Sequence, residues 1–341
     1  MQGETTVPDP RRQLTLNQIL GHDVIRAYLM RCIAQDQLPQ SILFSGPAGV
    51  GKRTLAWALV REIIAEGGDP ASHRGSLKAA RGTHPDICFC EAKSAAGQIV
   101  IDDIRDLDEW TSRYPVESQY KFGVIAPADK MNPNSANALL KLLEEPPKHL
   151  VLILITADPS LLLPTIRSRC TPLPLEAVPL AELVPWLIGK SGVGRERVEL
   201  AAELAEGRPG YALSLLQSGG LEQRGKIIGE LRTLKEHGFA TVFGVAERLG
   251  SMGDPGRTLK TMVLLLRDAL SVSLGMDRIL NRDLAEDLRA LGEGLSPGAV
   301  LEAAALAETA AGEAADYYAA AARAHFLEVL VTRMGRELRR A

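Results

Sequence analysis

The chain has 341 residues, of which 46% are hydrophobic and 24% charged, so it is long enough for two or three globular domains. Its formal net charge of −3 argues against one dominant nucleic-acid-binding surface. The sequence shows no apolar run long enough to cross a bilayer, no secretory signal, and too few cysteines for a disulfide framework, so we expect a reduced, cytoplasmic protein without a membrane partner.

The first clear elements surround a glycine-rich loop. Helical periodicity begins near Leu14, and the short apolar run 41–44 predicts a buried strand. The segment Gly46-Pro47-Ala48-Gly49-Val50-Gly51-Lys52 follows, and from residue 55 apolar residues recur at helical spacing. Strand, glycine loop and helix in this order are the context of a phosphate-binding P-loop.

Each position of this loop has an expected role. The glycines that let backbone N–H groups approach phosphate oxygens are Gly46, Gly49 and Gly51. Lys52 would meet the β- and γ-phosphates, but Arg53 stands where Ser or Thr ligates Mg²⁺, and a guanidinium cannot bind a cation. Thr54 comes one residue late, about 100° around the helix. Residual ATP or ADP binding and a loop kept only for the fold both remain open.

The central part of the chain alternates between strands and helices. Residues 66–83 are predicted to be a loop or insertion. The predicted elements after it are a strand at 87–90, a helix at 101–110, a strand at 122–126, a helix from the cap Asn132-Pro133 to Pro146-Pro147, and a strand at 150–156. This alternation predicts an α/β domain with a parallel sheet.

The remainder of the chain is predicted to be helical. A proline cluster places a first boundary near residue 174, and Ser218-Gly219-Gly220 indicates a second. We therefore expect three domains, at 1–173, 174–218 and 219–341. The last helix is expected from about Ala311 to Arg340.

At this point the sequence resembles a known family. The matching segments are GHDVIRAYLMRCI (21–33), SILFSGPAGVGKRTLA (41–56), GTHPDI (82–87), IVIDDIRDL (99–107), NPNSANALLKLLEEPP (132–147), ITADPSLLLPTIRSRC (155–170) and GRPGYAL (207–213). Together they resemble the delta-prime family of subunits of the bacterial DNA polymerase III clamp loader, in the AAA+ group. The resemblance implies a RecA-like domain, a small helical lid, and an all-α collar that assembles into a ring of five subunits.

The resemblance also implies that the ATPase site is degenerate. Active members end a strand with two acids that hold Mg²⁺ and orient water; Ala126 and Pro127 stand there, and Asp129 follows two residues later. The lid arginine position holds Gly210, two residues from Arg208. Thr156 matches the polar sensor position of the family. Together with Arg53, these losses predict a chain that does not hydrolyse ATP.

One family element is complete, namely Ser168-Arg169-Cys170. In the family, this arginine enters the ATP site of a neighbouring subunit as an arginine finger, which in GTPases raises the rate by roughly 10³–10⁵. From the residues alone, Arg169 and Arg167 would merely neutralise a helix C-terminus. With the resemblance, we expect the finger.

Zinc is the one metal to consider. His84, Cys88 and Cys90 lie close in sequence, but residues 66–83 contain none of the cysteines of the family's four-cysteine zinc module. We therefore expect no metal, and the two cysteines fit a core role.

Three functions follow. The first is a non-hydrolysing subunit of the clamp loader within the DNA-directed DNA polymerase complex, with gamma/tau ATPase and delta subunits as partners and the sliding clamp and primed DNA reached through the complex. The second is an active AAA+ ATPase, such as the clamp-loader motor subunit or a branch-migration motor. The third is a module that senses ATP or ADP without turnover.

Overall fold

The computed structural model describes residues 10–92, 97–217, 219–237, 241–252, 255–276, 279–313 and 320–338. The chain divides into two compact units, and each is described separately. The first takes the residues up to Gly192 together with Ala205–Ala212, and the second takes Val193–Leu204 and the residues from Leu213 onward. The expected division into three domains stays a prediction.

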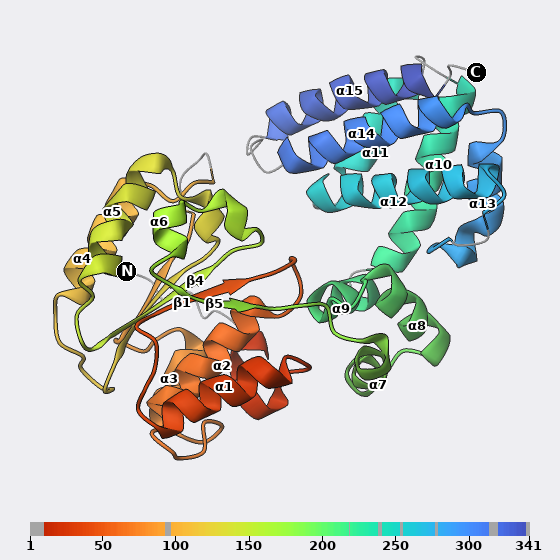
Figure 1. Ribbon diagram of the computed structural model, residues 1–341. Helices are drawn as coiled ribbons and strands as arrows, with labels where there is room; N and C mark the ends of the chain where they lie inside the picture. Colours follow the sequence, from red (N-terminus) through yellow and green to blue (C-terminus); the bar gives the residue numbers. More distant parts are fainter. Residues whose placement is uncertain are drawn as a thin grey trace. The chain divides into compact units, whose positions relative to one another are not determined.

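The first unit is built on a parallel sheet of five strands (Figure 1). The strands are β1 (Ser41–Ser45), β2 (Ile87–Cys90), β3 (Lys121–Ile125), β4 (Leu150–Ile155) and β5 (Thr171–Pro174), in the spatial order β2-β3-β4-β1-β5. Each neighbouring pair is parallel. The predicted α/β class with a parallel sheet is therefore confirmed.

Helices cover both faces of this sheet (Figure 1). They are α1 (Asp23–Ala34), α2 (Lys52–Ile64) and α3 (Arg74–Arg81) on one face, and α4 (Ile101–Thr111), α5 (Pro133–Glu144) and α6 (Pro164–Arg167) on the other. Consecutive strand residues point to opposite faces, so Ile153 joins the core under α2 whereas Leu152 and Leu154 join the core under α4 and α5. Two buried faces explain why β4 is a continuous apolar run.

Two elements of the first unit differ from the sequence prediction. Residues 66–83 are not only a loop, because α3 occupies Arg74–Arg81 and ends at Gly82, whose φ is +71°. Ser76 anchors α3, since its hydroxyl donates to the carbonyl oxygen of Arg61 at 2.8 Å. The proline-rich segment that we used as a boundary contains β5, which pairs with β1.

A buried arginine fixes the segment that precedes α1. Arg61 is 1% exposed and lies on α2. Its guanidinium donates to the carbonyl oxygens of Gln13, Leu14 and Pro70. One side chain thus ties three stretches of backbone together, which holds the N-terminal segment against the helix that follows the P-loop.

The second unit is helical throughout its described residues (Figure 1). Its helices are α8 (Arg195–Leu204), α10 (Gly220–His237), α11 (Val242–Gly250), α12 (Pro255–Ser273), α13 (Ala285–Gly292), α14 (Pro297–Glu313) and α15 (Ala320–Glu337). Helices α10 to α15 enclose one hydrophobic core, which includes Leu231, Leu265 and Val331. Helix α7 (Leu180–Ser191) belongs to the first unit. Helix α9 (Pro209–Gln217) begins in the first unit and ends in the second, because the division falls after Ala212.

The expected last helix from Ala311 to Arg340 is wrong at its start, because Ala311 belongs to α14 and α15 begins at Ala320. Arg340 lies outside the described residues. Among the helices that the structure describes, none is long and apolar enough to span a membrane.

Candidate functional site

The glycine loop lies where β1 ends and α2 begins. Gly46, Gly49 and Gly51 have φ values of +134°, +87° and +118°, which side-chain-bearing residues rarely adopt. A Cβ at Gly46 would lie 2.1 Å from the carbonyl oxygen of Leu175, so only glycine fits there. The loop thus has the backbone of a phosphate cradle at the N-terminus of α2.

Lys52 closes this loop from inside. Its side chain is 8% exposed, and Nζ donates to the carbonyl oxygens of Gly46 at 2.5 Å and Pro47 at 2.9 Å. Burial lowers the pKa of Lys52, and the nearby carboxylate of Asp129 opposes this shift. The lysine therefore stands at the cradle as the P-loop position requires.

Arg53 has a partner at a distant part of the sheet. Its Nη2 lies 2.6 Å from Oε1 of Glu91, which follows β2, and its guanidinium carbon lies 5.4 Å from the centroid of the Phe89 ring. That ring stacks on Trp57 of α2 at 4.9 Å. Arg53, which directly follows the P-loop lysine, thus has its own carboxylate partner, and Thr54 is half-buried in the first turn of α2.

The end of β3 carries no acid. Ala126 is 2% exposed, its N–H donates to the carbonyl oxygen of Cys90 at 3.1 Å, and Pro127 is exposed. Asp129 lies in a short 3₁₀ turn, where Oδ1 accepts a hydrogen bond from the hydroxyl of buried Thr156 at 2.7 Å. Thr156 and Asp129 therefore satisfy each other, a pairing that the sequence did not predict.

The lid segment of the first unit meets the P-loop through its backbone. The N–H of Gly210 donates to the carbonyl oxygen of Gly49 at 2.9 Å. Arg208 is engaged locally, because its Nε donates to the carbonyl oxygen of Ala205 at 2.7 Å and its guanidinium lies 4.9 Å from the centre of the Tyr211 ring.

The Ser168-Arg169-Cys170 segment follows α6. Arg169 is accessible, with a side chain 36% exposed, and its Nη2 lies 2.7 Å from Oε1 of Glu144. Cys170 is 6% exposed within the core under α4 and α5, and burial raises the pKa of its thiol to about 11. The segment thus exposes the arginine and buries the cysteine.

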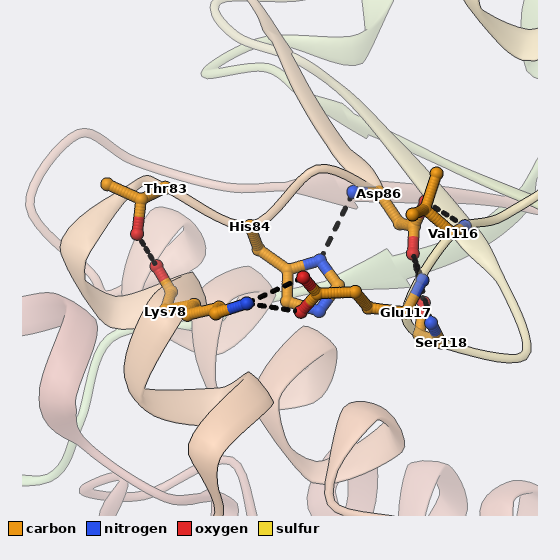
Figure 2. A network of polar contacts seen from close by, with 7 residues as sticks. All are labelled: Lys78, Thr83, His84, Asp86, Val116, Glu117 and Ser118. Carbon is orange, nitrogen blue, oxygen red and sulfur yellow. Dashed lines mark hydrogen bonds and ion pairs between the residues drawn. The ribbon is translucent and has the colours of Figure 1, made fainter.

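His84 belongs to a hydrogen-bond network (Figure 2). Its Nδ1 accepts from the N–H of Asp86 at 3.2 Å, while the Lys78–Glu117 ion pair lies beside its ring (Figure 2). Asp86 is fully buried and accepts from the N–H groups of Val116, Glu117 and Ser118 at 2.7, 2.7 and 3.0 Å. This network fixes the loop before β3 to the start of β2.

Cys88 and Cys90 lie on β2, with Cys90 in the core under α4. Within the described ranges, no group of three or more His, Cys, Asp or Glu side chains is placed to hold a metal ion. The absence of zinc stays a prediction.

Sequence reasoning missed two acids that now define the site. Glu91 comes directly after the strand predicted at 87–90. The carboxyl ends of parallel strands share one sheet edge, so Glu91 lies at the same edge as the P-loop. Glu144 lies inside the quoted LLEEPP segment, but its partner is 25 residues away in sequence. The sequence pattern thus indicated where Glu91 and Glu144 lie in the fold, but it did not indicate their ion pairs with Arg53 and Arg169.

The fold and the glycine loop together define an α/β P-loop protein with a parallel sheet. Residues 21–179 match the family model described as DNA polymerase III, delta subunit. The DNA polymerase III subunit delta' of Bacillus subtilis is 31% identical over 275 residues, which cover 76% of this chain and 81% of that protein. The chain therefore belongs to the family of DNA polymerase III delta' subunits.

Two further relatives show the range of the similarity. The delta' subunit of Pseudomonas aeruginosa is 37% identical over 212 residues, 60% of this chain and 64% of that protein. The gamma/tau subunit of Mycobacterium tuberculosis is 32% identical over 174 residues, 49% of this chain and 30% of that protein. Both delta' and gamma/tau subunits are thus similar in sequence to this chain.

Proposed function

We propose that this chain is a non-hydrolysing subunit of the DNA polymerase III clamp-loader complex that donates Arg169 to the ATP site of a neighbouring subunit. The observation that supports the first half is that Arg53, where the resemblance expects a magnesium-ligating hydroxyl, pairs with Glu91, while Ala126 and Pro127 follow β3 where it expects two acids. Phosphoryl transfer relies on metal ions and a water-orienting group, and these positions supply neither.

The second half is supported by the contrast between Arg169 and its neighbour Cys170. Arg169 is exposed whereas Cys170 is buried, and an arginine's planar fork suits a phosphoryl group in transfer. The resemblance implies the partners of this proposal: gamma/tau subunits would bind and hydrolyse ATP, and a delta subunit would complete the ring. The sliding clamp and primed DNA would be met through the complex, which would work in the bacterial cytoplasm.

Nucleotide sensing without turnover is the second candidate, and the geometry of Lys52 and the three glycines favours it. ATP or ADP would then bind in the cradle without hydrolysis, and no cofactor would be required. Equilibrium binding of labelled nucleotide to the isolated chain tests this candidate. An active ATPase would need acids that the end of β3 does not provide.

The test of the proposed function uses the isolated chain and then the reconstituted complex. The isolated chain is expected to show no magnesium-dependent ATP hydrolysis. In the complex, Arg169→Ala should remove clamp- and DNA-stimulated hydrolysis at the site that this finger serves, where a finger contributes roughly 10³–10⁵ in rate. Arg167→Ala, also exposed two residues away, is the matched control. Unchanged hydrolysis with Arg169→Ala would refute the role.

A further inference from the structure

Arg169 is folded back onto its own subunit. Its Nη1 donates to the carbonyl oxygen of Thr165 at 3.1 Å, and its Nη2 bonds Oε1 of Glu144 at 2.7 Å. Thr165 lies four residues earlier, on α6, so the side chain runs back along the helix that precedes Arg169. Glu144 is the last residue of α5, which packs beside α6 (Figure 1). Both terminal nitrogens of the fork are therefore engaged within this chain.

A carboxylate and a phosphoryl group compete for the same face of a guanidinium. Each presents oxygens that accept charge-assisted, often paired, hydrogen bonds from the fork. An arginine finger acts through positive charge delivered to the transferring group, and a carboxylate at 2.7 Å offsets that charge. Glu144 thus holds the same donors that a neighbouring phosphate would need.

The exposure of the pair makes this contact reversible. The side chains of Arg169 and Glu144 are 36% and 52% exposed, and exposed ion pairs contribute little. The second unit provides a contrast, because Arg224 is only 3% exposed, contacts Asp283 at 2.7 Å and also donates to Asn281. Arg224 is held in place permanently, whereas Arg169 can exchange its partner at small cost.

We propose that Glu144 is a positioning residue that restrains Arg169 on its own subunit, and that the arginine acts in trans only after it exchanges this carboxylate for a phosphoryl group. This inference rests on the proposed function, since it assigns the control of the same arginine. Glu144 lowers the rate of the stimulated reaction, and its removal raises that rate.

The test is a double-mutant cycle in the reconstituted complex, with clamp- and DNA-stimulated ATP hydrolysis as the readout. Glu144→Gln should raise kcat about 1.4- to 5-fold, the range that exposed ion pairs allow, with KM for ATP unchanged. In the Arg169→Ala background the same substitution should have no effect, because the restrained group is gone. Glu145→Gln, at the adjacent exposed position, should leave kcat unchanged in both backgrounds.

The outcomes separate this inference from the proposed function. If Glu144→Gln leaves kcat unchanged or lowers it while Arg169→Ala abolishes stimulation, the restraint is wrong and the arginine finger stands. If Arg169→Ala itself has no effect, both proposals are wrong. An equal effect of Glu144→Gln with and without Arg169 would also overturn the restraint, since it would then act through another group. Thermal unfolding and the size of the complex check that each variant folds and assembles.

Discussion

The N–H of Gly210 donates a hydrogen bond to the carbonyl oxygen of Gly49, with the two atoms 2.9 Å apart. A Cβ at Gly210 would lie 3.1 Å from the same oxygen, which is tighter than ordinary contact. The backbone around Gly210 therefore approaches the P-loop closely, and a larger residue at position 210 would push the two segments apart.

Gly49→Ala should destabilise the first unit by about 1–3 kcal/mol, because it places a side chain in the left-handed region and crowds the lid segment. The φ of Gly49 is +87°, and a Cβ there would lie 3.1 Å from the amide nitrogen of Tyr211. Gly189→Ala on α7 is the matched control, since its Cβ meets no atom within 4 Å, and it should stabilise by about 0.5–1 kcal/mol. Urea unfolding measures both, and equal effects would contradict the prediction.

Restoring the metal ligands should restore a dependence on magnesium. In the variant that combines Arg53→Thr, Ala126→Asp and Pro127→Glu, Mg²⁺ should tighten ATP binding, because a hydroxyl and two carboxylates replace groups that cannot bind a cation. Titration with fluorescent ATP, with Mg²⁺ or with a chelator, measures this difference. Glu91→Gln frees Arg53 without adding a ligand and should show no such dependence. Magnesium-dependent binding by the unmodified chain would contradict our reading of the site.

The network around Asp86 should make the first unit sensitive to acid. Burial raises the pKa of Asp86, but hydrogen bonds from the amides of Glu117, Val116 and Ser118 outweigh burial, so the pKa lies below its ordinary value of 3.8. The stabilisation by this carboxylate is therefore full above pH 3.8 and is lost as the pH falls through the lowered pKa. Burial also lowers the pKa of His84 below 6.5, so stability falls as the pH drops below 6.5 and the unfolded chain takes up the proton.

Two variants separate these contributions. Asp86→Asn should lower the free energy of unfolding by about 1.5–3 kcal/mol at neutral pH, as expected for the loss of hydrogen bonds to a charged group. Asp106→Asn on the exposed side of α4 should be neutral. His84→Gln should flatten the pH dependence of the unfolding midpoint between pH 5 and 7. The reason is that the unfolded chain of this variant has no imidazole at position 84 to take up a proton. If the slope in this range is unaltered, the assignment to His84 is wrong.

Cys170 should resist alkylation in the folded protein. Its pKa of about 11, raised from 9.0 by burial, lowers the thiolate fraction roughly 100-fold at neutral pH, and only the thiolate is nucleophilic. Mass spectrometry of iodoacetamide-treated protein, native and in urea, would measure the ratio of the two labelling rates. Similar rates in the two states would show that Cys170 is accessible, against its 6% exposure.

The alternation of strands and helices made most of the first unit predictable. The cap at Asn132 is as expected, since its side chain accepts from the N–H of Ser135 at 2.8 Å. The strand β5 was not predicted, because its prolines indicated a boundary rather than a strand. They occupy alternate positions, Pro172 and Pro174, so the missing N–H groups face away from β1 while Leu175 donates to Ser45 at 2.8 Å.

The misses elsewhere have a common physical cause, namely contacts between segments distant in sequence. The short helix α3 lies in a segment rich in glycine, alanine and polar residues, and Ser76 and Ala79 are buried in it only because α2 lies alongside. The roles expected for the individual site residues stay predictions. The pairings of Arg53 with Glu91 and Arg169 with Glu144 depend on tertiary structure, which no sequence spacing encodes.

The ion pair between Arg53 and Glu91 has one further consequence. A magnesium ion leaves when its concentration falls or when the nucleotide departs, but a cation attached to the polypeptide cannot diffuse away. The carboxyl-terminal edge of this sheet therefore keeps the same charge arrangement whatever the cellular supply of divalent ions or the ratio of ATP to ADP. At this edge the positive charge is part of the covalent structure of the protein itself.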